Sequence, residues 1–320
     1  MKVKYLLTLT AGLLLGATTS RAQMGFGKPK DIAVVKSQPL IVILKDEDPK
    51  ELKKLANKPE DLATYQGYIA SYNSQMQELV PKLWKFSPTV EFKHAADLPA
   101  LRKAKGEKHG VLQQSTLVTT HRHYNGGAGM PGGATNSANY TYSSDKVLAF
   151  TLEVYGDGDE NKVWMVQVAP GPIYSSDVVF SVRTLQTYVQ SRADGRSGSD
   201  MRAEVAANGK RLPTKTLLID EQDLKDKLTA ADIKQAYPYP YQVVPRQTIE
   251  QAVAAADTRY AYIRVLPVTE SIFAQVAVEA ATSDLLAISM PGAMQTMALH
   301  SGGSVVSKAS LKDFAKAGGK

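Results

Sequence analysis

The stretch Leu40-Ile-Val-Ile-Leu-Lys-Asp46 is an apolar run that ends in charged residues, and Thr216-Leu-Leu-Ile-Asp220 resembles it in the second half of the chain. A short apolar run rich in β-branched residues is typical of a buried strand. Two such runs in one chain raise the question of an internal repeat, which the order of the following elements can answer.

Each run is followed by elements in the same predicted order: helix, strand, helix, strand. In the first half they are predicted at residues 60–84, 89–92, 97–105 and 110–115. In the second half they are predicted at residues 229–236, 241–244, 248–256 and 260–265. Strands that are separated by helices imply parallel crossovers, so each half predicts parallel strands with helices packed on them.

A hairpin, a Pro-Gly break and a helix close each half. The hairpins are predicted at 146–169, with the turn at Gly156-Asp-Gly-Asp-Glu-Asn161, and at 272–290. Closing helices are predicted at 176–192 and 310–317. We therefore predict an α/β fold of two similar units, each a mixed sheet with helices packed on it, produced by internal duplication.

Composition sets the predicted boundaries between the parts of the chain. Residues 23–38 are rich in Gly, Lys and Pro and predict a loose leader. The first unit covers 39–192 and contains a Gly/Asn/Ser-rich loop at 124–139. The polar, Gly-bearing segment 193–213 is predicted to be a linker, and the second unit covers 214–320.

Residues 1–22 have the three parts of a cleavable secretory signal peptide. Lys2 and Lys4 supply the positive charge, residues 6–16 the apolar segment, and Ala22 the small residue before cleavage. An apolar segment of 11 residues is too short for a transmembrane helix, which needs roughly 20. We expect an exported protein, periplasmic or secreted, whose mature chain begins at Gln23.

Composition also excludes several classes of protein. The chain has no cysteine, which excludes disulfides, thiol catalysis and zinc–thiolate sites. The formal charge of +7 includes three basic residues of the signal peptide, so +4 remains for the mature chain. That charge is mild and scattered, so we expect no nucleic-acid partner. Residues 276–289 are interrupted by Glu279 and Asp284, so we expect no membrane span in the mature chain.

His121 and His123 are the candidate metal ligands. Two histidines at positions i and i+2 of a strand lie on one side of it and can share an ion such as zinc. A catalytic zinc site needs a third ligand, which no nearby residue supplies at a recognisable spacing, although His94 or His109 can approach in space. The alternative is a polar pair at a strand end beside a flexible loop.

Two further motifs match part of the sequence pattern of known binding sites but lack the rest of what those sites need. Gly127-Ala-Gly-Met-Pro-Gly132 fits the dinucleotide fingerprint, but Pro131 and the polar residues that follow do not allow the required helix. Asp157, Asp159 and Asn161 resemble the start of a calcium loop without its glycine and final glutamate, and a hairpin tip explains them. We predict no cofactor and no catalytic residue.

Tyr237, Tyr239 and Tyr241 alternate with prolines and are the candidate binding residues. Stiffened rings can stack on a sugar or a partner peptide, or they can form a rigid connector that covers the edge of the core. The surrounding stretch Leu228-Thr-Ala-Ala-Asp-Ile-Lys-Gln-Ala-Tyr-Pro-Tyr-Pro-Tyr-Gln-Val-Val244 resembles a segment of uncharacterised secreted bacterial proteins. The resemblance extends over residues 216–267; it implies export and implies no chemistry.

The function expected from these observations is non-catalytic. We expect an exported protein that binds or scaffolds an unknown ligand or protein in the bacterial envelope or outside the cell. The alternative is a metal-dependent hydrolase that uses His121 and His123. Stoichiometric zinc that is lost when both histidines are changed to alanine would favour the hydrolase. A deep cleft between the two units would favour a small ligand.

Overall fold

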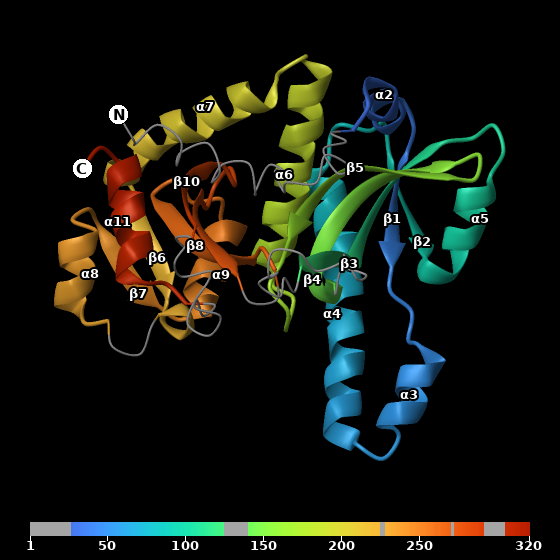
Figure 1. Ribbon diagram of the computed structural model, residues 1–320, viewed down its shortest axis with the longest axis horizontal. Coiled ribbons are helices and arrows are strands. Elements are labelled where there is room, and N and C mark those ends of the chain that lie inside the picture. The colour runs from blue at the N-terminus through green and yellow to red at the C-terminus, as the bar shows by residue number, and fades with distance from the viewer. Residues whose placement is uncertain (1–26, 125–139, 225–227, 270–271, 291–304) are drawn as a thin grey trace, which may run out of the picture.

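The structure is a computed structural model that describes residues 27–124, 140–224, 228–269, 272–290 and 305–320. These residues form two five-stranded mixed sheets that lie on either side of a central helix (Figure 1). Sheet A contains β1 (Leu40–Leu44), β2 (Val90–His94), β3 (His109–Tyr124), β4 (Tyr140–Gly156) and β5 (Asp159–Gln167). Sheet B contains β6 (Thr216–Asp220), β7 (Tyr241–Val244), β8 (Tyr260–Pro267), β9 (Phe273–Glu279) and β10 (Leu285–Ser289).

The two sheets have the same topology. The strand order is β2-β1-β3-β4-β5 in sheet A and β7-β6-β8-β9-β10 in sheet B. In each sheet the strand that comes first along the chain, β1 or β6, is parallel to both of its neighbours. The next two pairs, β3–β4 and β4–β5 in sheet A and β8–β9 and β9–β10 in sheet B, are antiparallel. The predicted α/β fold of two similar mixed-sheet units is therefore confirmed.

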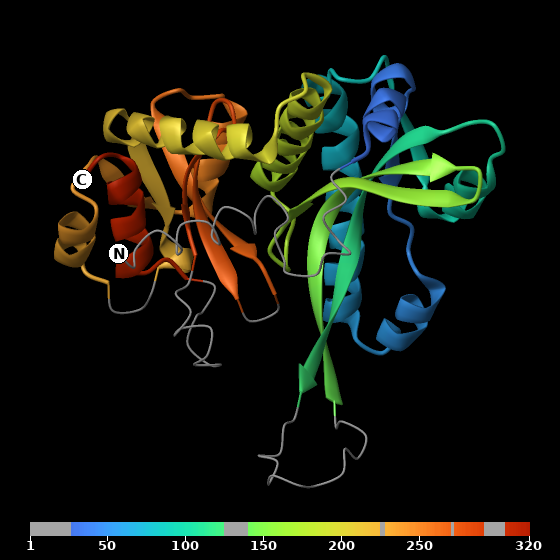
Figure 2. The same ribbon diagram turned by 45° about the horizontal axis from the view of Figure 1, so that its top comes forward.

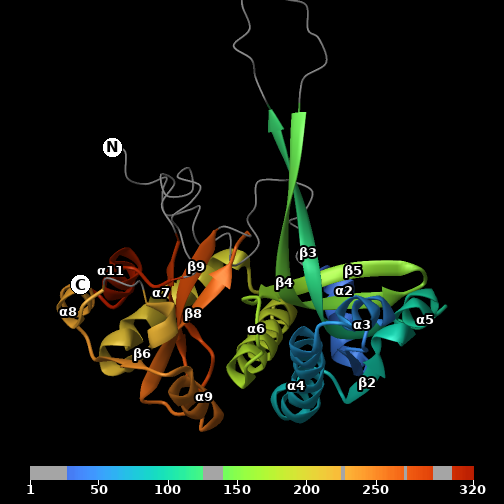
Figure 3. The same cartoon turned by 90° about the horizontal axis from the view of Figure 1, so that it is seen from below.

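Helices cover both faces of each sheet. The first unit contains α3 (Pro49–Leu55), α4 (Pro59–Leu83), η1 (Ala95–Asp97), α5 (Leu98–Lys103) and α6 (Ser175–Ala193). The second contains η3 (Glu221–Asp223), α8 (Ala230–Ala236), α9 (Arg246–Ala254) and α11 (Lys308–Ala317). On sheet A, α4 and α6 cover one face and α5 the other. On sheet B, α9 and α6 cover one face, and α8 and α11 cover the other (Figures 1 and 3).

Two segments predicted to be irregular contain helices. The predicted leader 23–38 contains α2 (Pro29–Ser37), because Ile32 and Val35 are buried in the core and Pro29 begins the helix. The predicted linker 193–213 joins the units, but it consists largely of α7 (Gly198–Asn208) and the 3-10 helix η2 (Gly209–Thr214). Its start is capped by Ser197, whose hydroxyl accepts a hydrogen bond from the Asp200 amide.

The hairpin of β3 and β4 is much longer than its predicted strands. On β3 the pairing with β1 ends at Leu112, and on β4 the pairing with β5 begins at Ala149. Beyond these points β3 and β4 pair with each other and with no other described strand, as far as Tyr124 and Tyr140. This two-stranded ribbon projects away from both sheets (Figures 2 and 3). Its sequence is mostly polar, so it carries little of the apolar pattern that indicates a strand.

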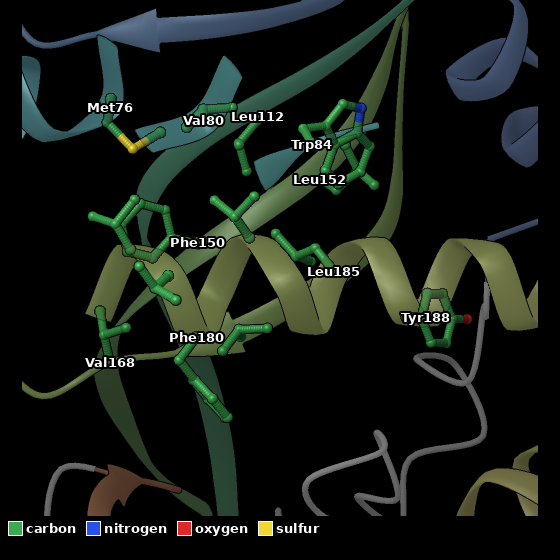
Figure 4. Close-up of a cluster of buried hydrophobic side chains, with 14 of the residues drawn as sticks. Met76, Val80, Trp84, Leu112, Phe150, Leu152, Val168, Phe180, Leu185 and Tyr188 are labelled. Carbon is green, nitrogen blue, oxygen red and sulfur yellow. The ribbon is translucent and has the colours of Figure 1, made fainter. Parts of the chain in front are cut away.

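One shared core joins the two units. It contains buried residues of sheet A, α4 and α6, among them Trp84, Phe150 and Leu185, together with Tyr262 and Val276 of sheet B. Figure 4 shows the side chains of α4, of sheet A and of α6 packed together. Ten residues of α6 are buried, which is typical of a helix enclosed on more than one side.

A second core lies on the other face of sheet B. Leu217 and Ile219 of β6 and Ile263 of β8 pack there against Leu311 and Phe314 of α11. Among the helices of the described residues, none is both long enough and apolar enough to cross a lipid bilayer.

The carboxylate of a capping box at the start of α8 also pairs with a lysine of α11. The Thr229 hydroxyl accepts a hydrogen bond from the Asp232 amide, and the Asp232 carboxylate accepts one from Thr229. Lys308 of α11 lies 3.1 Å from the same carboxylate. These contacts, that with the Thr229 hydroxyl first, lower the pKa of Asp232 from 3.8 to about 2.

We expect this carboxylate to contribute to acid unfolding. Because its pKa is lower in the folded chain, its stabilising effect is present above pH 4 and is lost as the pH falls from about 4 to about 2. In Asp232→Asn the free energy of unfolding, measured in urea at pH 5 and pH 2.5, should fall less than in the wild type. Gln235→Ala removes another acceptor of Lys308 and should keep the wild-type pH dependence. Equal pH dependence in Asp232→Asn and the wild type would contradict the prediction.

Candidate functional site

The predicted metal ligands lie on the projecting ribbon. His121 and His123 belong to β3, where their backbones pair with Ser143 and Thr141 of β4. As positions i and i+2 of a strand they share one face of the ribbon. Their side chains lie outside the described part of the structure. Among the residues that are described, no group of three or more His, Asp or Glu is placed to hold a metal ion; the metal site at His121 and His123 stays a prediction.

The three tyrosines of the proline-rich run contact the second core. Tyr237 is fully buried, and its ring meets that of Tyr239 edge-on at 5.3 Å. The hydroxyl of Tyr239 donates to the Ala315 carbonyl, and that of Tyr241 donates to the Ala230 carbonyl. These contacts join α8, β7 and α11, which is what a rigid connector does; the buried ring of Tyr237 offers no surface for stacking.

The carboxylates that resemble a calcium loop form a hairpin tip. Asp157 and Gly158 have positive φ values of 58° and 81°, which a tight two-residue turn between β4 and β5 requires. Lys108 lies 3.6 Å from the carboxylate of Asp157 and 3.9 Å from that of Asp159. The predicted hairpin is confirmed, while the glycine motif at 127–132 lies outside the described residues.

A pocket lies at the junction of the two units. Its walls are β5, which is the edge strand of sheet A, the helices α6 and α7, and the turn between β9 and β10 of sheet B. The pocket has a volume of about 110 Å³. In Figure 1, α7 leaves the end of α6 and crosses above β10. The site is therefore built from both units and from the segment that joins them.

Aromatic and aliphatic side chains form most of the pocket wall. Trp164 of β5 stacks on Tyr188 of α6, with ring centres 4.1 Å apart and planes 9° apart. Phe180 of α6, Met201 of α7, Leu266 of β8 and Leu285 of β10 are among the other apolar residues of the wall. A concave, mainly apolar site with a few polar groups is the usual form of a small-molecule site.

Ser283 supplies a polar group that the described residues leave unsatisfied. It has a φ of 63°, and it is 6 % exposed. No described group forms a hydrogen bond with its hydroxyl. A buried hydroxyl without a partner costs free energy, so the position of Ser283 in the pocket wall favours a ligand that supplies the bond. Asn208 and Thr184 add neutral polar groups to the same wall.

The charged residues of the pocket wall are both acidic and both paired. Among the described residues that line the pocket, only Glu204 and Asp284 carry charge. Glu204 lies 2.5 Å from Arg196, and Asp284 lies 2.8 Å from Arg211. The described wall therefore offers no cation to an anionic ligand, and its carboxylates are already neutralised.

A buried ion cluster supports the β9–β10 turn from behind. Glu279 is 3 % exposed; it pairs with Arg211 and lies 2.5 Å from Lys215. Burial lowers the pKa of Lys215. Arg211 and Lys215 thus hold the end of the joining segment against sheet B, next to Asp284 and the pocket.

Polar contacts at the other end of α6 hold the two units in a fixed relation. Arg264 of β8 is 4 % exposed; it donates to Asp177 of α6 at 2.6 Å and lies over the Phe180 ring. Burial alone would lower the pKa of Arg264, but Asp177 and Tyr262 more than offset it and the pKa is raised. On α9, the Glu250 carboxylate accepts hydrogen bonds from the hydroxyls of Ser175 and Ser176 and from the Ser176 amide.

The structure also forms a histidine–carboxylate pair that the sequence analysis did not find. The Nδ1 atom of His94, at the end of β2, lies 2.6 Å from the Asp46 carboxylate, just beyond the end of β1. Both side chains are largely exposed, at 59 % and 40 %. The parallel pairing of β1 and β2 brings them together. Such a pair fixes the tautomer of the imidazole, which suits acid–base chemistry or a surface hydrogen bond equally.

No family model, curated protein or solved structure matches this chain. The junction pocket combines concavity, apolar lining and an unsatisfied polar group, whereas the His94–Asp46 pair is largely exposed.

Proposed function

We propose that the protein is exported and binds a small, neutral, mainly apolar ligand in the junction pocket. The observation that carries this proposal is the buried hydroxyl of Ser283, which has no partner among the described residues and lies in the wall of an apolar pocket built by both units. The predicted signal peptide at residues 1–22 supports the export.

The volume limits the size of the bound group. A volume of about 110 Å³ is somewhat less than that of an engineered apolar cavity of about 150 Å³ that takes up benzene. The junction pocket is partly open, so a longer ligand can extend out of it. A single ring or a short branched chain is the portion expected inside.

The wall chemistry defines the rest of the ligand. Two carboxylates, each already paired with an arginine, do not favour an anion. The Trp164–Tyr188 stack and the methionine and leucine side chains favour apolar surface. A hydroxyl or amide on the ligand would satisfy Ser283. The metal-dependent hydrolase at His121 and His123 remains the alternative, and metal analysis of the purified protein separates the two.

Three ring compounds of nearly equal size test the binding. In a Trp84→Phe background Trp164 is the sole tryptophan, and its emission reports on the pocket that it lines. We expect benzyl alcohol and toluene to change this emission saturably and benzoate to do so only weakly. Ser283→Ala should weaken the binding of benzyl alcohol by about 2- to 10-fold, which is the value of one hydrogen bond. The binding of toluene should stay unchanged.

A pocket-filling variant gives the matched control. Thr184→Phe places a ring inside the pocket and should abolish the binding of both neutral probes. Gln190→Phe places the same ring on the exposed side of α6 and should leave binding intact. Equal responses in these two variants, or no response in the parent protein, would overturn the proposed function.

A further inference from the structure

We propose that Lys45 and Gln114 bind the carboxylate group of a second ligand, at the edge of sheet A where β1 and the parallel part of β3 end. Neither residue lines the junction pocket. The proposal therefore does not depend on the ligand that is inferred for that pocket.

The topology of the first unit favours a ligand at this edge of the sheet. β1 is paired with β2 on one side and with β3 on the other, and both pairings are parallel. The connection from β1 to β2 contains α4 on one face, and the connection from β2 to β3 contains α5 on the other face. Such a change of direction is a topological switch point, and open α/β sheets bind ligands outside the carboxyl ends of the strands at this point.

Lys45 directly follows the last residue of β1 and is positioned by α4. Its amide donates a hydrogen bond to Asn73 Oδ1 at 2.8 Å, and its carbonyl accepts one from the Asn73 side chain at 2.9 Å. Its ammonium lies 5.8 Å from the ring centre of Tyr68 and 5.0 Å from that of Tyr72. A cation is attracted to the face of an aromatic ring at such distances, so α4 fixes both the backbone and the side chain of Lys45.

Lys45 is a partly buried cation to which the described chain supplies no counter-ion. Burial lowers the pKa of Lys45, and no described carboxylate offsets that shift. The next carboxylates along the chain have other partners, since Asp46 contacts His94 and Glu47 accepts a hydrogen bond from Gln66. A charge that is partly removed from water is stabilised when an opposite charge reaches it, so this edge of the sheet favours an anion.

The corresponding edge of sheet B provides an internal comparison. There β6 ends at Asp220, which is 1 % exposed, and Arg246 at the start of α9 lies 2.5 Å from its carboxylate. The second unit therefore supplies both charges of the pair from its own chain. At the end of β1 the described part of the first unit supplies a cation and no anion.

Gln114 adds a directional donor beside the ammonium. It lies on β3 two residues beyond Leu112, the last residue that pairs with β1. The Tyr68 hydroxyl donates a hydrogen bond to its Oε1 atom, and no described group accepts one from its Nε2 atom. Tyr68 thus contacts both the amide of Gln114 and the ammonium of Lys45. A carboxylate that bridges these two donors forms charge-assisted hydrogen bonds with both.

The charges around the site favour a single negative charge on the ligand. Burial raises the pKa of Tyr68, the hydrogen bond to Gln114 opposes that rise, and the nearby Asp177 carboxylate adds to it. A phosphate group carries about −1.5 to −2 charges at neutral pH, so Asp177 repels it more strongly than it repels a carboxylate. One ammonium and one amide therefore suit a carboxylate better.

Acylation of the lysine amines tests the site in the intact protein. A small active ester is the reagent, and mass spectrometry of the peptides gives the rate at each lysine. Acetate is the probe, with chloride at the same ionic strength as the reference. We expect acetate to slow the acylation of Lys45 saturably, by about tenfold at about ten times its dissociation constant. Lys50, which is exposed on α3, should react at the same rate in both salts.

Three variants separate a built site from a general effect of salt. Gln114→Leu should weaken the protection of Lys45 by acetate by about tenfold or more, the value of a hydrogen bond to a charged group. Tyr68→Phe keeps the ring but releases the amide, and it should also weaken the protection. Tyr65→Phe removes a hydroxyl three residues earlier on α4 and should keep it. The buried amine of Lys215 should stay unreactive in each variant, which shows that the chain is folded.

The results that would overturn the proposal are specific. Equal slowing of Lys45 by acetate and chloride, or equal slowing of Lys45 and Lys50 by acetate, would exclude a built site. Protection by inorganic phosphate but not by acetate would contradict the carboxylate. Wild-type protection in Gln114→Leu would remove the amide from the site. Each of these results leaves the emission of Trp164 unaffected, so the junction pocket is tested independently.

Discussion

Replacing Asp177 with asparagine is expected to lower the free energy of unfolding by about 3–5 kcal/mol, because it leaves a buried charge without its partner. Arg264 is 4 % exposed and donates to the Asp177 carboxylate at 2.6 Å. The change also weakens the bond from the Tyr174 amide, which caps the start of α6. Urea unfolding followed by tryptophan fluorescence measures the loss.

A double variant separates the charge from the packing. Asp177→Asn combined with Arg264→Met removes both charges, and most of the lost stability should return, since apolar residues often replace a buried pair without loss. The exposed pair Lys82–Glu78 is the matched control. Glu78→Gln should cost at most about 1 kcal/mol. If Asp177→Asn cost no more than Glu78→Gln, the Asp177–Arg264 pair would not hold the junction.

Replacing Phe180 with alanine is the second change with a large expected effect. Phe180 is 1 % exposed on α6, lines the pocket and lies beneath the Arg264 guanidinium. Removing a buried phenylalanine typically costs about 3–5 kcal/mol. Because α6 belongs to the core that both sheets share, we expect both units to lose this stability together, in a single transition.

Two probes test whether the units unfold together. Both tryptophans lie in the first unit, so their fluorescence follows that unit, and hydrogen exchange of β8 and β9 follows the second. In Phe180→Ala the two measurements should shift by the same amount. Phe314→Ala, in the second core, gives a control of the same type. A loss confined to β8 and β9 in Phe314→Ala, with the fluorescence transition unchanged, would show independent units.

The sequence predicted the strands of both sheets well where they are apolar. Runs such as 40–44 and 216–220 lie inside a sheet with helices on both faces, so nearly every side chain is buried and the pattern is strong. The helix α7 was missed because only Met201 is buried on it. The ends of β3 and β4 were missed because a ribbon without a covering layer carries no apolar face.

The candidate site was beyond sequence reasoning for a geometrical reason. Trp164, Tyr188, Met201 and Ser283 belong to different elements, and only the packing of the two units brings them together. Each is an ordinary residue in its local sequence. The histidines and tyrosines were predicted to be site residues because of their residue type, yet Tyr237 lies in the second core. Only the idea that a cleft between the units would favour a small ligand pointed to the junction.

The way in which α6 joins the units has a consequence for assembly. The first unit contacts the second through the side covered by α4 and α6. The second unit makes this contact through its α9 side, which by its place in the topology corresponds to the α5 side of the first unit. Contacts between unlike surfaces of like subunits are heterologous and can propagate without end. On the α5 side, the buried Glu153 carboxylate accepts hydrogen bonds from Tyr155 and Gln113, and Arg102 pairs with Glu160. On this side the first unit is closed by its own helix, with Leu101 packed on Ile41 and Val111, so within the described chain the joint between the two units is made once and is not repeated.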